Sequence, residues 1–123
     1  MEARLLRRAS MTDLLDAYRQ AAMRHGTASS AGDYTVGNPQ ADIVAAIYRE
    51  LRNRGGDASN ALLGLLDDQD AGVRSWAAAH ALEIAPEKGI PVLEALADSD
   101  VWPLNTSADM TLKVWRKGEL RFP

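Results

Sequence analysis

The residues that could carry chemistry in this 123-residue chain are two histidines and several carboxylates, because cysteine is absent. His80 could act as a metal ligand or as a general base oriented by Glu83 or Asp109. His80 also falls on an apolar face at helical spacing, where a half-buried histidine with one satisfied hydrogen bond is the more ordinary role. Since His25 is distant in sequence and no thiolate is available, we expect no dedicated metal site and no cofactor.

The acidic run Asp67, Asp68 and Asp70 has two interpretations. A calcium loop needs ligands at alternating positions, a central glycine and a distal glutamate, and these are missing here. The run instead suits a tight turn in which Asp70 is the N-cap of the next helix, where the helix dipole favours negative charge. Arg74 is one of two basic residues in the surrounding acidic block, and we expect it to pair with one of these aspartates across the turn.

Aromatic residues and a long polar stretch supply the candidates for binding. Trp76 and Trp115 fall on apolar stripes and are most simply core residues. Trp102 lies in a predicted turn and is the best candidate for an exposed anchor, since tryptophan is enriched at binding hot spots. Residues 26–38 are small and polar, and we expect them to form the longest loop, a second candidate surface. The candidate binding residues are Trp102, Arg74, His80, Asp33 and Tyr34.

Length and charge narrow the class of protein. A chain of this size is expected to form one domain. It contains no apolar run long enough to cross a membrane, and without a signal peptide or cysteine we expect a cytoplasmic location. Residues 57–109 hold ten acidic residues against two basic ones, and residues 110–123 hold four basic residues against one acidic one. An acidic body favours a basic partner and disfavours nucleic acid.

Helix signals dominate the first half of the chain, and strand signals are weak. Ser10 predicts the N-cap of a helix that ends at Gly26. Asn38 followed by Pro39 predicts the start of a second helix, which ends at Gly55. Asp57 then caps a short leucine-rich third helix.

The second half continues in the same way. Asp70 caps a fourth helix at about residues 71–85, which Pro86 ends. Since Pro91 cannot lie deep in a helix, the fifth helix is predicted to begin near Ile90 and to end near residue 98. Thr106 predicts the N-cap of the sixth helix, which basic residues and Gly118 end.

A repeat connects these elements. Residues 62–70 (LLGLLDDQD) align with residues 92–100 (VLEALADSD) at a spacing of 30, so the helix pair in 57–85 recurs in 86–117. Such a period with two helices per unit is typical of an α-solenoid. We therefore predict an all-α fold, a short right-handed α-solenoid of about three antiparallel helical hairpins. The predicted boundaries are 1–10 for an N-terminal extension, 11–118 for a single repeat domain and 119–123 for a C-terminal tail.

The pattern LLxLLDDxDxxVRxWAA in residues 62–78 resembles a HEAT repeat. With TLKxWRxG in residues 111–118, the chain more closely resembles a small bacterial HEAT-like family described only as a domain of unknown function. The second repeat departs from the HEAT pattern, because Leu104 stands where Arg74 stands in the first. The resemblance implies a helical-repeat fold and a binding role, with no agreed activity.

The expected function is therefore a non-enzymatic binding module for protein–protein interaction. Its groove would be lined by the second helix of each pair and would meet a protein partner, with a basic one favoured. Three alternatives stay open: an immunity-type inhibitor that covers a toxin or enzyme, a nucleic-acid-binding protein and an enzyme using His80. A homodimer through the outer face of the final pair is a further alternative. Nucleic-acid binding would require the convergence of Arg49, Arg52, Arg54, Lys113, Arg116 and Lys117.

Overall fold

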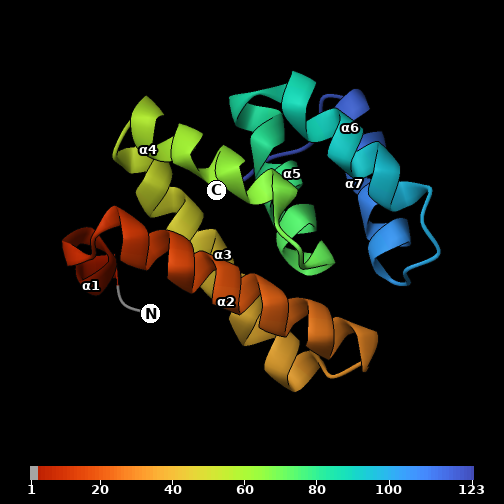
Figure 1. The fold of residues 1–123 in the computed structure, drawn as a ribbon, viewed down its shortest axis with the longest axis horizontal. Helices are drawn as coiled ribbons and strands as arrows, with labels where there is room; N and C mark the ends of the chain where they lie inside the picture. Colours follow the sequence, from red (N-terminus) through yellow and green to blue (C-terminus); the bar gives the residue numbers. More distant parts are fainter. Residues whose placement is uncertain (1–2) are drawn as a thin grey trace.

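A computed structural model describes residues 3–123 and places seven α-helices and one 3₁₀ helix there, without any strand (Figure 1). This confirms the predicted all-α class. In chain order the elements are α1 (Ala3–Arg8), α2 (Met11–Ser30), α3 (Tyr34–Asn53), α4 (Gly56–Ala61), the 3₁₀ helix η1 (Leu62–Asp67), α5 (Ala71–Ile84), α6 (Pro86–Ala97) and α7 (Leu104–Arg116).

Helix α5 lies at the centre of the arrangement. Helices α2 and α3 pack side by side as a long hairpin at one side of it, and α6 and α7 pack together at the other (Figure 1). Helix α5 contacts α2, η1, α6 and α7. A helix with neighbours on so many sides must be apolar around most of its circumference, which explains the alanine-rich sequence of α5.

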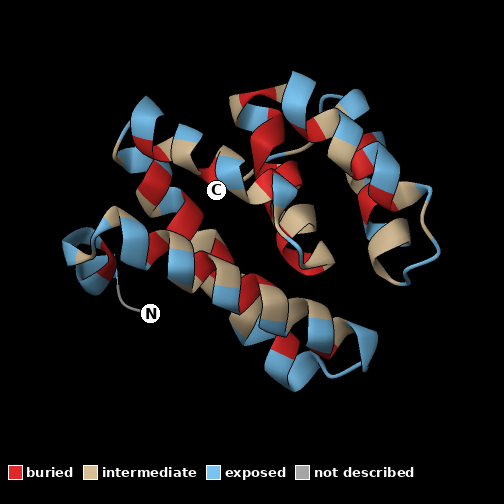
Figure 2. Cartoon of the chain, in the orientation of Figure 1, coloured by how far each residue is buried: buried red, intermediate tan, exposed pale blue. Residues whose placement is uncertain are grey.

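The core consists of two clusters that meet at α5. The first cluster, between α2 and α3, includes the fully buried Leu14, Ile47 and Leu51. The second lies between α5, α6 and α7 and includes Leu93 and a group of α5 alanines. Buried residues follow the inward faces of the helices, as Figure 2 shows.

Glycines set the spacing of the helices around α5. A Cβ atom added to Gly72 would lie 3.1 Å from the carbonyl oxygen of Ala22 and 3.5 Å from the Cα of Gly26, so α5 and α2 cross almost backbone to backbone. A Cβ on Gly89 of α6 would lie 2.7 Å from the carbonyl oxygen of Ala78. Any side chain at these crossings would push the helices apart.

The predicted loop at residues 26–38 is wrong, because most of it is helical. Helix α2 continues to Ser30, α3 begins at Tyr34, and the connection is only residues 31–33. Gly26 marks the crossing with α5 and not a helix end. Pro39 lies inside α3, where its ring removes one intrahelical hydrogen bond while the first turn still packs on α2.

Two predicted helix starts in the second half are also wrong. Helix α5 ends at Ile84, before Pro86 as predicted, but α6 begins at Pro86 and not near Ile90, because a proline at the first helical position loses no hydrogen bond. Pro91 lies inside α6 on an exposed face. Helix α7 begins at Leu104, two residues before the predicted cap at Thr106.

Two predicted N-caps are confirmed. The Ser10 hydroxyl accepts from the Asp13 amide at 3.1 Å, and the Asp70 carboxylate accepts from the Val73 amide at 3.0 Å. These caps depend on contacts within one turn, which is why local sequence predicts them.

Both ends of the described chain return to the domain. In the region predicted as an extension, Leu6 of α1 is buried, and Arg54 donates hydrogen bonds to the carbonyl oxygens of Leu6 and Ala9 at 2.8 and 2.7 Å. At the other end, the predicted tail, residues 119–123, crosses behind α5 toward α3 (Figure 1), and Phe122 packs against the first core cluster. We call residues 119–123 the tail segment.

Candidate functional site

A recess of about 150 Å³ lies between α2 and α7, with α5 as its floor. We call it the central groove. Its floor combines small residues with an indole, its α7 wall carries two hydroxyl groups, and the tail segment closes one end. The lining residues are His25, Gly72, Ser75, Trp76, Ala79, Leu104, Ser107, Thr111, Leu120 and Phe122.

The recess continues toward the α2–α3 turn. A second hollow of about 180 Å³ shares Gly72 and Leu104 with it and adds Thr27, Ser30 and Asp70. The groove thus runs along α5 between α2 and α7. We expected a groove lined by the second helix of each pair, but α2 stands where α3 was expected, because the glycine crossing brings α2 directly against α5.

His25 and Trp76 form the polar contact at the base of the central groove. The Nε1 of Trp76 donates to the Nδ1 of His25 at 3.1 Å, and the two rings meet edge to face with centroids 5.3 Å apart. Burial lowers the pKa of His25, which favours the neutral ring that can accept this bond. The contact fixes both rings as parts of the binding surface.

His80 lies just beneath the groove and is 1% exposed, not half-buried as predicted. Its Nδ1 hydrogen-bonds the hydroxyl of Tyr18 at 2.7 Å, and its ring stacks on Tyr48 with centroids 3.8 Å apart. The ring of Phe122 meets it edge-on at 4.7 Å. Burial, with a smaller contribution from the charge of Arg52, lowers the pKa of His80 to about 3, so the ring is neutral at physiological pH.

The two carboxylates considered as partners of His80 are engaged elsewhere. Glu83 accepts from the hydroxyl of Tyr48 and lies 3.6 Å from Arg52. Asp109 forms an ion pair with Lys113 on α7 at 2.8 Å. The structure brings His80 together with two tyrosines, an arrangement that orders a core and supports the surface above it.

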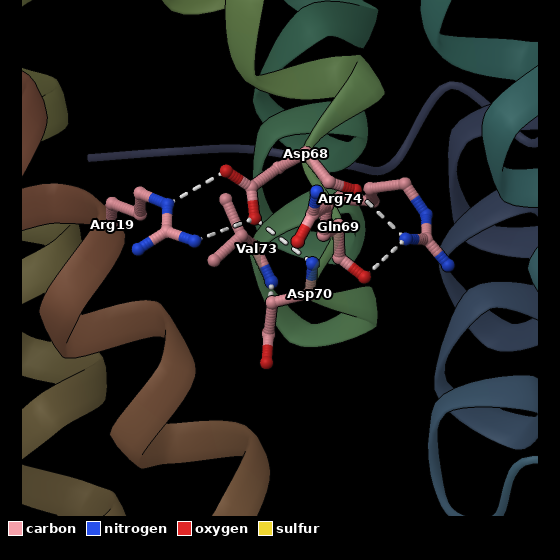
Figure 3. A network of polar contacts seen from close by, with 6 residues as sticks. All are labelled: Arg19, Asp68, Gln69, Asp70, Val73 and Arg74. Atoms are coloured by element: carbon pink, nitrogen blue, oxygen red, sulfur yellow. Dashed lines mark hydrogen bonds and ion pairs between the residues drawn. The ribbon is translucent and has the colours of Figure 1, made fainter.

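Arg74 makes different contacts from those predicted (Figure 3). The carboxylate of Asp68 binds Arg19 of α2 through two nitrogens, at 2.7 and 3.3 Å, and accepts the amide of Asp70 at 2.9 Å. Arg74 donates to the main-chain carbonyls of Asp68 and Gln69 at 2.8 and 3.0 Å. The predicted pairing with an aspartate carboxylate is therefore wrong: Arg19 occupies that position, and Arg74 satisfies carbonyls at the turn after η1.

Trp102 is 64% exposed in the turn between α6 and α7, as predicted. Its neighbour Val101 lines a separate apolar hollow of about 360 Å³ between α5 and α6, which Arg74 also borders. Leu104, two residues further on, lines the central groove. The turn that carries Trp102 thus separates two recesses.

Asp33 and Tyr34 lie at the α2–α3 turn, away from the central groove. Tyr34 is 70% exposed. Asp33 accepts from the hydroxyl of Thr35 at 2.7 Å, a bond that lowers the pKa of its carboxyl. They present a tight turn and not the long loop that the sequence predicted.

Sequence reasoning missed Tyr18, Tyr48 and Phe122 as parts of the site. Tyr18 lies on α2 and Tyr48 on α3, so their contacts with His80 come from two separate helices. The usable signal was that Phe122 is the one phenylalanine of the chain. It lies in residues 119–123, which are predicted from the sequence to be a C-terminal tail.

Most of the basic residues considered for nucleic acid are already paired. Arg52 and Arg54 lie on α3, and Lys113 and Arg116 on α7, so two separate helices carry them. Their acidic partners are Glu83, Glu50, Asp109 and Glu94 respectively.

In residues 3–123, no three histidine, aspartate or glutamate side chains gather where they could hold a metal ion. No helix in that part of the chain is long and apolar enough to cross a membrane.

The fold and the groove define an all-helical protein in which a recess between α2 and α7 overlies a buried aromatic cluster. The chain belongs to the family called domain of unknown function DUF2019, whose model matches residues 12–115. This confirms the resemblance to a family of unknown function. The crystal structure of the protein RPA1889 from Rhodopseudomonas palustris CGA009 is similar, with a TM-score of 0.87 and 28% sequence identity over 94% of this chain and 96% of that one. No curated protein matches.

Proposed function

We propose that the protein is a non-enzymatic, HEAT-like helical-repeat module that binds a segment of another protein in the central groove. The observation that carries this proposal is the groove itself, a recess with an indole and hydroxyl groups between α2 and α7. Concave sites of mixed apolar and polar lining on a rigid scaffold are the usual form of a ligand site.

The composition of the groove favours a peptide-like ligand. Leu104 and the ring of Trp76 offer apolar contact, while Ser75, Ser107 and Thr111 offer hydroxyl groups that can hydrogen-bond a main chain. The scaffold beneath is held by the glycine crossings and the His80 cluster, so little conformational entropy is lost when a ligand binds.

Charge favours a basic partner. The net formal charge is −3, and the acidic residues concentrate in residues 57–109, which supply the floor of the groove. Asp70 borders the groove at its open end. Opposite charge on a partner would raise the rate of encounter.

Site-specific photo-crosslinking in the source organism tests the proposal. A photoreactive residue at Ser107, on the groove wall, is expected to attach to a protein partner. The same residue at Glu87, which is exposed on α6 and outside the groove, is the matched control. Attachment from both positions or from neither would contradict the proposal.

A further inference from the structure

The tail segment lies on the domain in the manner of a bound peptide. Helix α7 ends at Arg116, and Gly118 turns the chain with a φ of 74°, which glycine adopts without strain. Residues 119–123 contain neither helix nor strand and cross behind α5 to reach α3 (Figure 1). The segment is therefore held by anchors and not by secondary structure of its own.

Two apolar anchors, two residues apart, fix this segment. Leu120 packs against the second core cluster and Phe122 against the first, while Arg121 between them is exposed. In an extended chain, alternate side chains point to the same side, so this spacing suits a peptide lying along a surface. The Phe122 ring is edge-on to His80 at 4.7 Å and to Tyr48 at 5.8 Å.

Arg52 of α3 holds the main chain of the segment. It donates to the carbonyl oxygen of Phe122 at 2.9 Å and to the main-chain oxygen of Pro123 at 2.7 Å. Bonds to main-chain oxygens do not depend on the side chains of the peptide. Arg52 could therefore hold another extended peptide in the same way.

The surface under the tail segment is held in place by contacts that do not involve the tail segment. His80 is fixed by the hydroxyl of Tyr18, and Tyr48 by Glu83, so both rings keep their places if Phe122 leaves. Such a pre-organised aromatic surface loses little entropy when a ligand replaces the tail segment.

We propose that this surface, centred on Tyr48, Arg52 and His80, binds an extended segment of a partner protein that carries leucine and phenylalanine two residues apart. The tail segment occupies the site in the free protein and is displaced by the partner segment. This inference goes beyond the proposed function, because the surface lies under the tail segment, whose Leu120 and Phe122 line one end of the central groove. A tethered competitor acts at an effective concentration on the order of millimolar, so a free peptide competes poorly until the tail segment is weakened.

Titration of the full-length chain with the peptide Lys-Gly-Glu-Leu-Arg-Phe-Pro, the sequence of residues 117–123, tests the inference. Calorimetry is expected to show binding to the Phe122→Ala variant at least about tenfold tighter than to the unaltered chain. Amide NMR shifts are expected in α3 and α5. If Phe122→Ala proves unfolded by circular dichroism, Phe122→Leu replaces it, since leucine keeps an apolar side chain there.

Three controls separate this reading from nonspecific binding. The peptide with alanine in place of its phenylalanine is expected to bind at least about tenfold more weakly, because its anchor is missing. Adding Arg52→Ala to the Phe122→Ala chain is expected to weaken binding. Adding Arg49→Ala, an exposed arginine on the same helix, is expected to leave binding unchanged.

Several results would overturn the inference. One is a folded Phe122→Ala chain to which the peptide shows no binding at millimolar concentration. Another is equal binding of the peptide with and without its phenylalanine. A dimer of the unaltered chain that forms by exchange of tail segments would show that a second copy is the occupant. If the peptide fails while Ser107 still crosslinks to a protein, the proposed function stands and this inference alone falls.

Discussion

His80 is the buried residue with the clearest consequence for stability. Its pKa of about 3 in the folded protein is far below the value near 6.5 of an unfolded chain. Between these two pH values the unfolded chain binds a proton that the folded protein does not. The free energy of unfolding must therefore fall as the pH is lowered through this window.

The expected loss from His80 at pH 4.5 is roughly 3 kcal/mol relative to pH 7.5, at about 1.4 kcal/mol per pH unit below 6.5. Urea unfolding at several pH values measures it. His80→Gln, which cannot titrate, should show a much shallower pH dependence even though its absolute stability is lower. An equal slope in both proteins would contradict the assignment.

The carboxylate of Asp68 forms an ion pair with Arg19, and this pair joins α2 to the turn before α5 (Figure 3). Arg19 and the Asp70 amide together lower the pKa of this carboxyl. Asp68→Asn is expected to lower the urea midpoint at pH 7, because the amide removes the charge that Arg19 binds. Asp67→Asn, at the exposed neighbouring position, should leave the midpoint nearly unchanged. Equal midpoints for both variants would refute the role of Asp68.

At the scale of elements, the close contact of α6 with α5 depends on Gly89. Its added Cβ would meet the main chain of Ala78 at 2.7 Å, and a backbone atom cannot rotate away. Gly89→Ala is expected to lower the free energy of unfolding by about 1–3 kcal/mol. Gly64→Ala, where the new Cβ meets nothing within 4 Å, is the control and should change stability little. Chemical denaturation measures both, and similar values would contradict the crossing.

Local chemistry made some helix boundaries predictable and left others out of reach. Ser10 and Asp70 were correct N-caps because a cap acts within one turn. Gly26 and Pro91 were misread because their places depend on which helix lies opposite. Gly26 lies where α2 crosses α5, and Pro91 lies on the exposed face of α6.

The candidate site was less predictable than the helices. The exposure of Trp102 was predicted from its place in a turn, and the structure confirms it. The bond between Tyr18 and His80 joins residues 62 positions apart, and no local pattern encodes it. The same holds for Phe122, whose contacts depend on the path of the chain after α7.

At the scale of the whole molecule, Trp102 is a position where a substitution is expected to affect binding without affecting stability. Because its ring is 64% exposed, Trp102→Ala is expected to change the free energy of unfolding by less than about 0.5 kcal/mol. If the ring is an anchor, the same change should reduce the yield of the Ser107 crosslink. Capture of every crosslinked partner at full yield would rule out the anchor.

The two bonds between Arg52 and the tail segment join positions 70 and 71 residues apart. A row of helices connected only to their neighbours can fray from its last member while the rest stays ordered. Here α7 continues into the tail segment, which is bound to α3. Movement of α7 away from the domain is therefore coupled to release of the tail segment from α3. A ligand that displaces the tail segment from α3 would therefore increase the mobility of α7.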